Sequence, residues 1–174
     1  DKHRFGGSDT CWVFLAATHE ARHLDDIIFC ADVLRQRGVS SASVLVFTDH
    51  PAARAHFAPY EMAEVHPLLD LSSVLSKQVY KYVVVVCGGH GGELGLQSQP
   101  PISPHGLFSA ISLVNGAEVA TVFLCQCYAG VFNYIDATRG NPHYVVIGST
   151  NFYPSLSAGI RLSKAIPTRN GLQG

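Results

Sequence analysis

Two motifs in the sequence carry side chains that could perform chemistry together. Residues 87–92 (CGGHGG) place His90 among four glycines, and residues 125–130 (CQCYAG) contain Cys127. A thiol beside an imidazole is a nucleophile with its general base, which is the minimum requirement for acyl transfer. The backbone N–H groups of Gly91 and Cys127 are candidates to stabilise a developing oxyanion. His90 and Cys127 are therefore the first candidates for a catalytic pair.

Each motif directly follows an apolar run that is typical of a buried strand. Residues 82–87 (YVVVVC) lead into the histidine motif, and residues 119–124 (VATVFL) lead into the cysteine motif. In an open parallel sheet, ligands bind beyond the carboxyl ends of the strands, and neighbouring strands lie about 4.8 Å apart. If these two strands are neighbours, the imidazole and the thiol reach the same edge of the sheet.

The rest of the chain alternates apolar runs with helical patterns. Further strands are predicted at 12–17, 44–47 and 144–147, helices at 24–34, 68–79, 103–114 and 156–160, and a short helix with an edge strand within 52–66. Apolar strands separated by helices indicate an α/β fold, a three-layer αβα sandwich with a mainly parallel central sheet. We expect residues 1–174 to form a single domain, excised or processed from a longer chain, with a tail at 165–174.

Composition excludes several functional classes. Apolar residues make up 47% of the chain and charged residues 14%, which excludes a disordered tail or a coiled coil. No apolar run reaches the ~18 residues of a membrane span, and the formal net charge of −1 predicts no nucleic-acid or membrane partner. The five cysteines are odd in number and irregularly spaced, so we expect a reducing, cytoplasmic location without a disulfide framework.

The two motifs resemble those of the caspase-like (clan CD) cysteine peptidases. In that clan one hydrophobic strand ends in His-Gly and a later one ends in Cys-x-[Ser/Ala]-Gly, which His90-Gly91 and residues 127–130 match. The motifs look closer to those of metacaspases and legumain-type enzymes than to those of animal caspases. The order of strands and helices also agrees, over roughly residues 11–160.

The resemblance implies an endopeptidase that cleaves a protein or peptide substrate through a thioester acyl-enzyme. Cys127 would be the nucleophile and His90 the base, with the N–H groups of Gly91 and Cys127 as oxyanion donors. No metal or organic cofactor takes part in this chemistry, although some metacaspases need calcium for activation. The resemblance also implies control by a regulatory subunit, an extra domain or processing.

The substrate-binding residues depart from the patterns of the clan. Metacaspases carry an acid two residues before the nucleophile, where this chain has Cys125, and caspases bind aspartate through arginines, for which Arg22 is the candidate. Ser149, Thr150 and Asn151 follow the last predicted strand, where the clan builds part of its specificity pocket. The residue preference at the cleavage site therefore stays open.

Three alternative interpretations compete with the peptidase. Cys87-x-x-His90 and Cys125-x-Cys127 offer four zinc ligands at one sheet edge, although structural zinc sites prefer wider gaps between paired cysteines. The glycine-rich segment lacks the spacing of phosphate-binding loops. A catalytically inactive domain of this fold would serve as an interaction module. His19 and His23, which follow the first strand, are further candidates to line the cleft.

Overall fold

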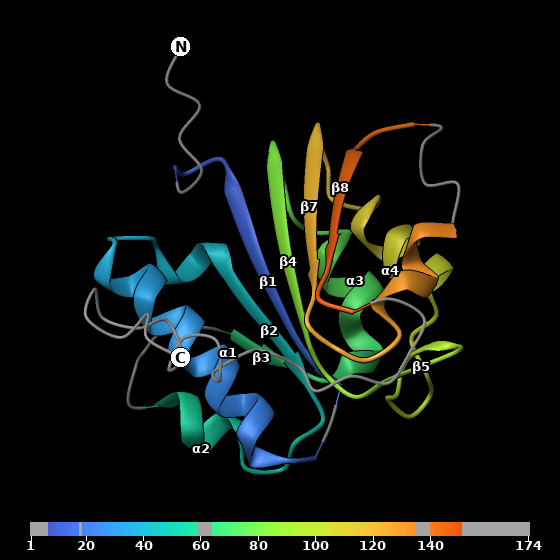
Figure 1. The fold of residues 1–174 in the computed structure, drawn as a ribbon. Coiled ribbons are helices and arrows are strands. Elements are labelled where there is room, and N and C mark those ends of the chain that lie inside the picture. Colours follow the sequence, from blue (N-terminus) through green and yellow to red (C-terminus); the bar gives the residue numbers. More distant parts are fainter. Residues whose placement is uncertain (1–6, 18, 59–63, 135–139, 151–174) are drawn as a thin grey trace, which may run out of the picture.

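The computed structural model describes residues 7–17, 19–58, 64–134 and 140–150 (Figure 1). Within them a six-stranded sheet has the order β3-β2-β1-β4-β7-β8, and every neighbouring pair is parallel. The strands are β1 (Thr10–Ala17), β2 (Val44–Thr48), β3 (Glu64–His66), β4 (Tyr82–Gly89), β7 (Val119–Leu124) and β8 (His143–Gly148). The five predicted strands and the edge strand within 52–66 are confirmed.

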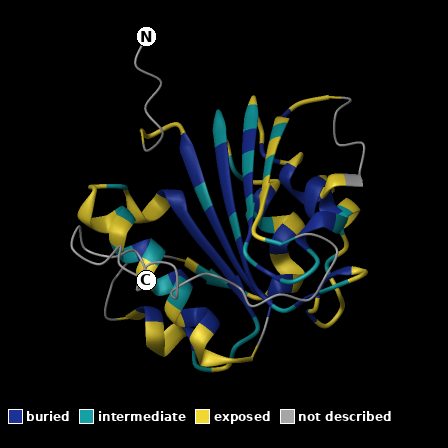
Figure 2. Cartoon of the chain, in the orientation of Figure 1, coloured by how far each residue is buried: buried dark blue, intermediate teal, exposed yellow. Residues whose placement is uncertain are grey.

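Helices cover both faces of the sheet, which confirms the three-layer α/β fold. α1 (Ala21–Gln36) and α2 (Ala53–Phe57) pack on one face, in a core that includes Phe14 and Val46. α3 (Leu71–Leu75) and α4 (Pro104–Ile111) pack on the other face, in a larger core. Burial on both sides explains why β1, β2 and β4 are apolar almost throughout, without the alternation of a half-exposed sheet. The deepest burial follows the central strands (Figure 2).

Local signals account for the start of α4. The Ser103 side chain accepts a hydrogen bond from the Gly106 N–H at 3.1 Å, and Pro104 occupies the first helical position. Both features stabilise a helix N-terminus, because they satisfy or remove N–H groups that have no partner within the helix. Short 3₁₀ helices connect other elements: η1 (Ser41–Ser43), η3 (Leu68–Asp70) and η4 (Ala129–Tyr134).

Two predicted elements differ from the structure. The helical stripe predicted to extend through Val79 ends at Leu75, and Val79 is 74% exposed and bridges to Asn115. The glycine-rich segment after the run at 82–87, for which no strand was predicted, contains a small antiparallel hairpin, β5 (Gly91–Gly92) with β6 (Gly95–Leu96). The helix predicted at 156–160 and the tail at 165–174 lie outside the described residues.

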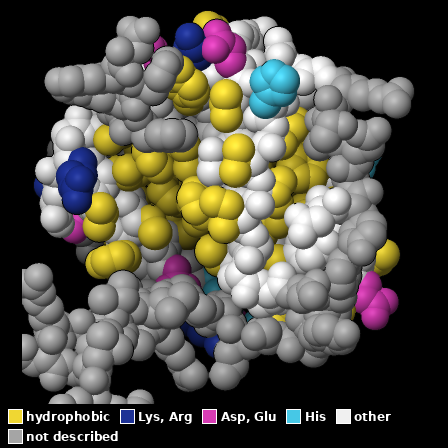
Figure 3. Space-filling view, turned by 45° about the horizontal axis from the view of Figure 1, so that its top comes forward, with side chains coloured by type: hydrophobic (Ala, Val, Ile, Leu, Met, Phe, Trp, Pro, Cys, Tyr) yellow, Lys and Arg dark blue, Asp and Glu magenta, His cyan; other side chains and the backbone are white. Residues whose placement is uncertain are grey.

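The helices do not cover the sheet evenly. On β8, the side chains of Val145 and Ile147 are 48% and 47% exposed in the described part of the chain. Figure 3 shows hydrophobic side chains gathered in the middle of one face of the molecule. Among the described residues, the helices are too short or too polar to traverse a bilayer.

Candidate functional site: a cysteine, a histidine and a carboxylate at one sheet edge

The sheet brings the two motifs together at the carboxyl ends of β4 and β7. These strands are neighbours, with Cys87 opposite Leu124 in the register, and the N–H of Cys125 donates to the carbonyl oxygen of Cys87 at 2.9 Å. His90 lies three residues beyond Cys87, and Cys127 lies three residues beyond Leu124. The expectation that the two strands deliver their motifs to one edge is confirmed.

Beyond the strands, the backbones of the two motifs are in direct contact. A Cβ atom built on Gly91 would lie 1.9 Å from the carbonyl oxygen and 2.9 Å from the carbonyl carbon of Cys127. Real Cβ atoms essentially never approach another heavy atom closer than 3.0 Å. Only glycine therefore fits after His90, and its missing side chain is what allows the two loops to meet.

A hydrogen-bonded turn holds Cys127. Tyr128 adopts a left-handed backbone conformation with φ of 56°, which is uncommon for a residue with a side chain. The Thr150 hydroxyl donates to the carbonyl oxygen of Gln126 at 2.8 Å and accepts from the N–H of Ala129 at 3.1 Å. One side chain thus bridges the residue before Cys127 and the second residue after it, which fixes the turn from the end of β8.

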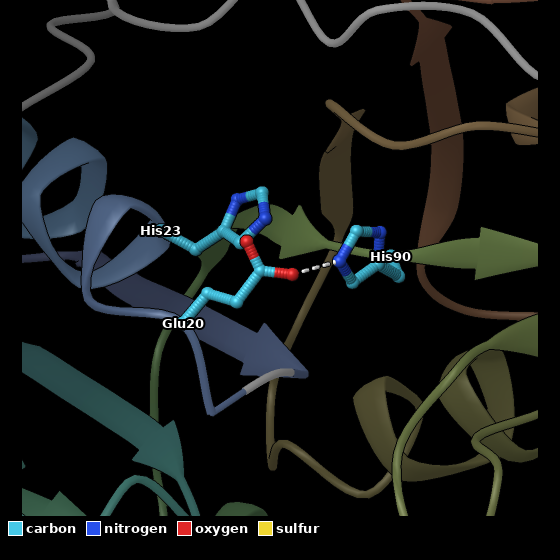
Figure 4. Close-up of side chains that lie close together, drawn as sticks. All are labelled: Glu20, His23 and His90. Atoms are coloured by element: carbon cyan, nitrogen blue, oxygen red, sulfur yellow. Dashed lines mark hydrogen bonds and ion pairs between the residues drawn. The ribbon is translucent and has the colours of Figure 1, made fainter.

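The imidazole of His90 is paired with a carboxylate from the other side of the site. Glu20, the N-cap residue of α1, hydrogen-bonds the Nε2 atom of His90 through its Oε1 atom (Figure 4). Its Oε2 atom forms an ion pair with the Nε atom of Arg22 at 2.5 Å. The hydrogen bonds from His90 and Arg22 lower the pKa of Glu20, so the carboxylate stays ionised and can accept from the ring.

A second histidine packs against the first. The rings of His23 and His90 meet edge to face, with centroids 5.3 Å apart and planes at 77°. His23 is only 4% exposed, and its Nε2 atom has no hydrogen-bond partner among the described residues. Burial lowers the pKa of His23, with a further contribution from the charge of Arg22. His23 therefore belongs to the site, as its position after the first strand suggested, whereas His19 is exposed.

Burial suppresses the ionisation of four thiols of the chain. Burial raises the pKa of Cys11 to about 12 and that of Cys30 to about 11, and it raises the pKa of the fully buried Cys87 further. The pKa of Cys125 is also raised, by burial and by the charge of Asp26. Since the thiolate is the reactive form of cysteine, these four thiols are poor nucleophiles.

The residues predicted to bind substrate differ in their contacts and in how far they are buried. The exposed Arg22 is paired with Glu20, and Cys125 is half-buried beside the candidate nucleophile. The backbone N–H of Ser149 donates to Leu124, and the Thr150 hydroxyl is engaged in the Cys127 turn. Asn151 lies outside the described residues.

A cavity of about 450 Å³ adjoins the turn. Its walls come from the β5–β6 hairpin, which includes Glu93 and Leu94, and from Gln97, Pro101 and Tyr128. A larger cavity of about 800 Å³ lies at the β3 edge of the sheet, lined by residues such as Arg54 and His66. The smaller cavity is the one lined by Tyr128, the residue that follows Cys127 in the sequence.

The structure does not gather the four ligands of the cysteine-based zinc alternative. Within the described ranges, one group of three or more metal-ligating side chains has its donor atoms close together, and it consists of Glu20, His23 and His90. Cys87 is fully buried in the core under α3 and α4. Glu20 is not among the site residues predicted from the sequence, although it lies three residues before His23 at the start of a helix.

The chain was compared with known families, proteins and structures. No protein-family model, no curated protein and no solved structure matches the chain.

Proposed function

We propose that this chain is a cysteine endopeptidase of the caspase-like type, with Cys127 as nucleophile and His90 as general base. The observation that carries the proposal is the contact between Gly91 and the Cys127 backbone. It joins a His-Gly motif and a Cys-x-Ala-Gly motif at the carboxyl edge of a parallel sheet, where ligand sites form in this class of fold. The motifs themselves supply the resemblance to the clan.

The proposed reaction begins when the sulfur of Cys127 attacks the carbonyl carbon of a peptide bond. His90 takes the thiol proton as the S–C bond forms, and it then gives this proton to the amine as the C–N bond breaks. The thioester is hydrolysed by water, whose proton returns through His90 to the sulfur as the S–C bond breaks. The N–H groups of Gly91 and Cys127 stabilise the oxyanion in both steps.

Glu20 gives the dyad a third, positioning member. Its carboxylate binds the Nε2 side of His90, which leaves the Nδ1 atom as the nitrogen that exchanges protons with the thiol. A carboxylate in this place holds the ring orientation and stabilises the imidazolium that forms during the reaction. Glu20 acts through His90 and does not touch the reacting atoms.

The proposed substrate is an extended peptide whose side chain enters the cavity beside Tyr128. Leu94 and Pro101 in its wall favour an apolar side chain next to the cleaved bond. Five free thiols suit a reducing compartment, so we place the activity in the cytoplasm. There it would need control by a partner, an extra domain or processing.

Active-site labelling tests the proposal without requiring the natural substrate. A peptide acyloxymethyl ketone should label the wild-type chain at Cys127, and hydrolysis of a positional-scanning peptide library should accompany the labelling. Cys127→Ala should lose both signals, while the matched control Cys125→Ala should retain both. Labelling that is equal in wild type and Cys127→Ala overturns the proposal. A folded wild-type chain that neither labels nor turns over peptides favours the inactive interaction module instead.

A further inference from the structure

A cluster of three side chains beside the dyad has the composition of a transition-metal site. Glu20, His23 and His90 each direct one ligand atom into a common space, and these atoms all lie within 4.8 Å of one another. Figure 4 shows the His23 ring directed toward His90, with the carboxylate of Glu20 between the two rings. We propose that this cluster binds a Zn²⁺ ion, and that the bound ion switches off the proposed peptidase.

The buried imidazole of His23 is the independent observation that points to a ligand. The residue is 4% exposed, and its Nε2 atom has no hydrogen-bond partner in the described part of the chain. A buried polar atom without a partner is unfavourable, since it has lost its bonds to water and gained none. A metal ion bound to Nε2 supplies the missing interaction at the place where two other ligand atoms already lie.

The donor set selects the class of metal. Two imidazoles and one carboxylate are the protein ligands of many zinc sites that keep an open fourth position. Calcium and magnesium prefer oxygen donors alone, so two of the three ligands here are unsuitable for them. Zinc bonds of about 2.0 to 2.2 Å require the ligand atoms to approach one another more closely than 4.8 Å. Glu20 and His90 can make this adjustment, because both side chains are nearly half exposed.

The surroundings of Glu20 suit a ligand as well as they suit a positioning residue. Its Oε1 atom is the one that contacts His90, while Oε2 is paired with Arg22. Zinc bound to Oε1 would replace the hydrogen bond to His90 and leave the pair with Arg22 in place. Such outer partners commonly fix the orientation of a metal-binding carboxylate.

The effect on catalysis rests on the proposed function and follows from the chemistry of the imidazole. In the proposed reaction, His90 must carry a proton on Nε2 while it accepts another from the thiol. A zinc ion on Nε2 takes the place of the first proton, and its positive charge makes the ring a much weaker base. Zinc therefore competes with the Glu20–His90 hydrogen bond and removes the general base without contacting the sulfur of Cys127.

Metal binding is tested first, in the Cys127→Ala background, where no peptidase activity is needed. Chelator-treated protein is titrated with Co²⁺ and followed by its visible absorption, and Zn²⁺ is titrated by calorimetry. We expect one equivalent to bind, without the charge-transfer band of a thiolate ligand. His23→Ala should weaken binding by about 100-fold or more, because second-shell changes alone cost 10- to 100-fold. His19→Ala is the matched control for an exposed histidine on the same segment and should bind normally.

Glu20→Gln is the second variant, because replacing a half-exposed side chain does not threaten the fold as a change at buried His23 does. It should also bind the metal more weakly. Undiminished binding in both His23→Ala and Glu20→Gln, absence of stoichiometric binding in the parent, or a thiolate band in the Cys127-containing chain overturns the site.

Inhibition is then measured on the active chain with a peptide substrate. Zinc should inhibit wild type and His19→Ala alike, and His23→Ala should need at least a tenfold higher zinc concentration for half inhibition. If the chain binds the metal but has no peptidase activity, the zinc site is supported and the proposed function is contradicted. Peptidase activity that zinc binding does not reduce leaves the function standing and removes the switch.

Discussion

Replacing Gly91 with alanine tests whether the two motifs depend on direct backbone contact. The new Cβ atom would stand 1.9 Å from the Cys127 carbonyl oxygen and 2.5 Å from the Cγ atom of the buried Gln126. To reach the 3.0 Å that real Cβ atoms keep, the loops must separate by roughly 1 Å. Overpacking of this kind costs about 1–3 kcal/mol of unfolding free energy. The melting temperature should fall by roughly 2 to 12 °C.

The same displacement should affect chemistry more than stability. A shift of about 1 Å between reacting groups can reduce a rate by about 100-fold. We therefore expect Gly91→Ala to lower kcat/KM on a peptide substrate, and the rate of Cys127 labelling by the peptide electrophile, by about two orders of magnitude. Circular dichroism would follow unfolding, and mass spectrometry would follow labelling.

Gly92→Ala provides the matched control on the neighbouring residue. Its nearest contact would be the side-chain amide nitrogen of Gln97 at 2.8 Å, the end of a flexible side chain that can move away. This variant should melt almost as wild type does. If Gly91→Ala melts like Gly92→Ala and its Cys127 is labelled as fast as in wild type, the two backbones are not in the contact described, and the proposed dyad at this edge loses its main support.

Three further predictions concern the turn, the thiols and a partly buried phenol. Thr150→Val should lower the unfolding free energy in urea by about 1–3 kcal/mol, because two polar backbone groups on either side of Cys127 lose their partner, whereas Thr150→Ser should stay near wild type. In iodoacetamide mapping of the native chain by mass spectrometry, Cys11 and the fully buried Cys87 should react last. A pKa of about 12 in place of 9.0 makes the thiolate fraction of Cys11 about a thousandfold smaller at neutral pH, and burial raises the pKa of Cys87 further. Labelling of Cys11 as fast as that of Cys127 would contradict this. Burial raises the pKa of Tyr144 from 10.0 to about 12, so the stability that it contributes is complete below pH 10 and is lost as pH rises toward 12. Tyr144→Phe should show a shallower decline in unfolding free energy over that interval, and identical slopes would refute the assignment.

The strands were predictable because the physics that forms them is local. The run before Cys87 is valine-rich and has no alternation, and this pattern fits a strand buried on both faces whatever surrounds it. The hairpin at Gly91–Gly92 and Gly95–Leu96 has no such pattern, because glycine contributes no side chain to one face or the other. Its geometry comes from close backbone approaches, which depend on the folded chain.

The candidate site was half predictable for the same reason. His90 and Cys127 can be recognised in the sequence because each lies in a glycine-containing motif at the end of a predicted strand. The contact between His90 and Glu20, in contrast, joins residues that are 70 positions apart. It depends on where β1 stops and α1 begins relative to β4, and no spacing rule in the sequence encodes that relation. The helix predicted at 68–79 ends at Leu75, before Val79, and this end is also a tertiary effect.

The Thr150 hydroxyl, which hydrogen-bonds the turn around Cys127, belongs to a residue that is 23 positions after Cys127 in the chain. During synthesis, the thiol emerges from the ribosome before the group that shapes its surroundings, and β8 must dock on β7 before that group arrives. A nascent chain that stops short of Thr150 thus exposes the cysteine without its working geometry. The order of translation itself delays the formation of this turn until β8 is in place.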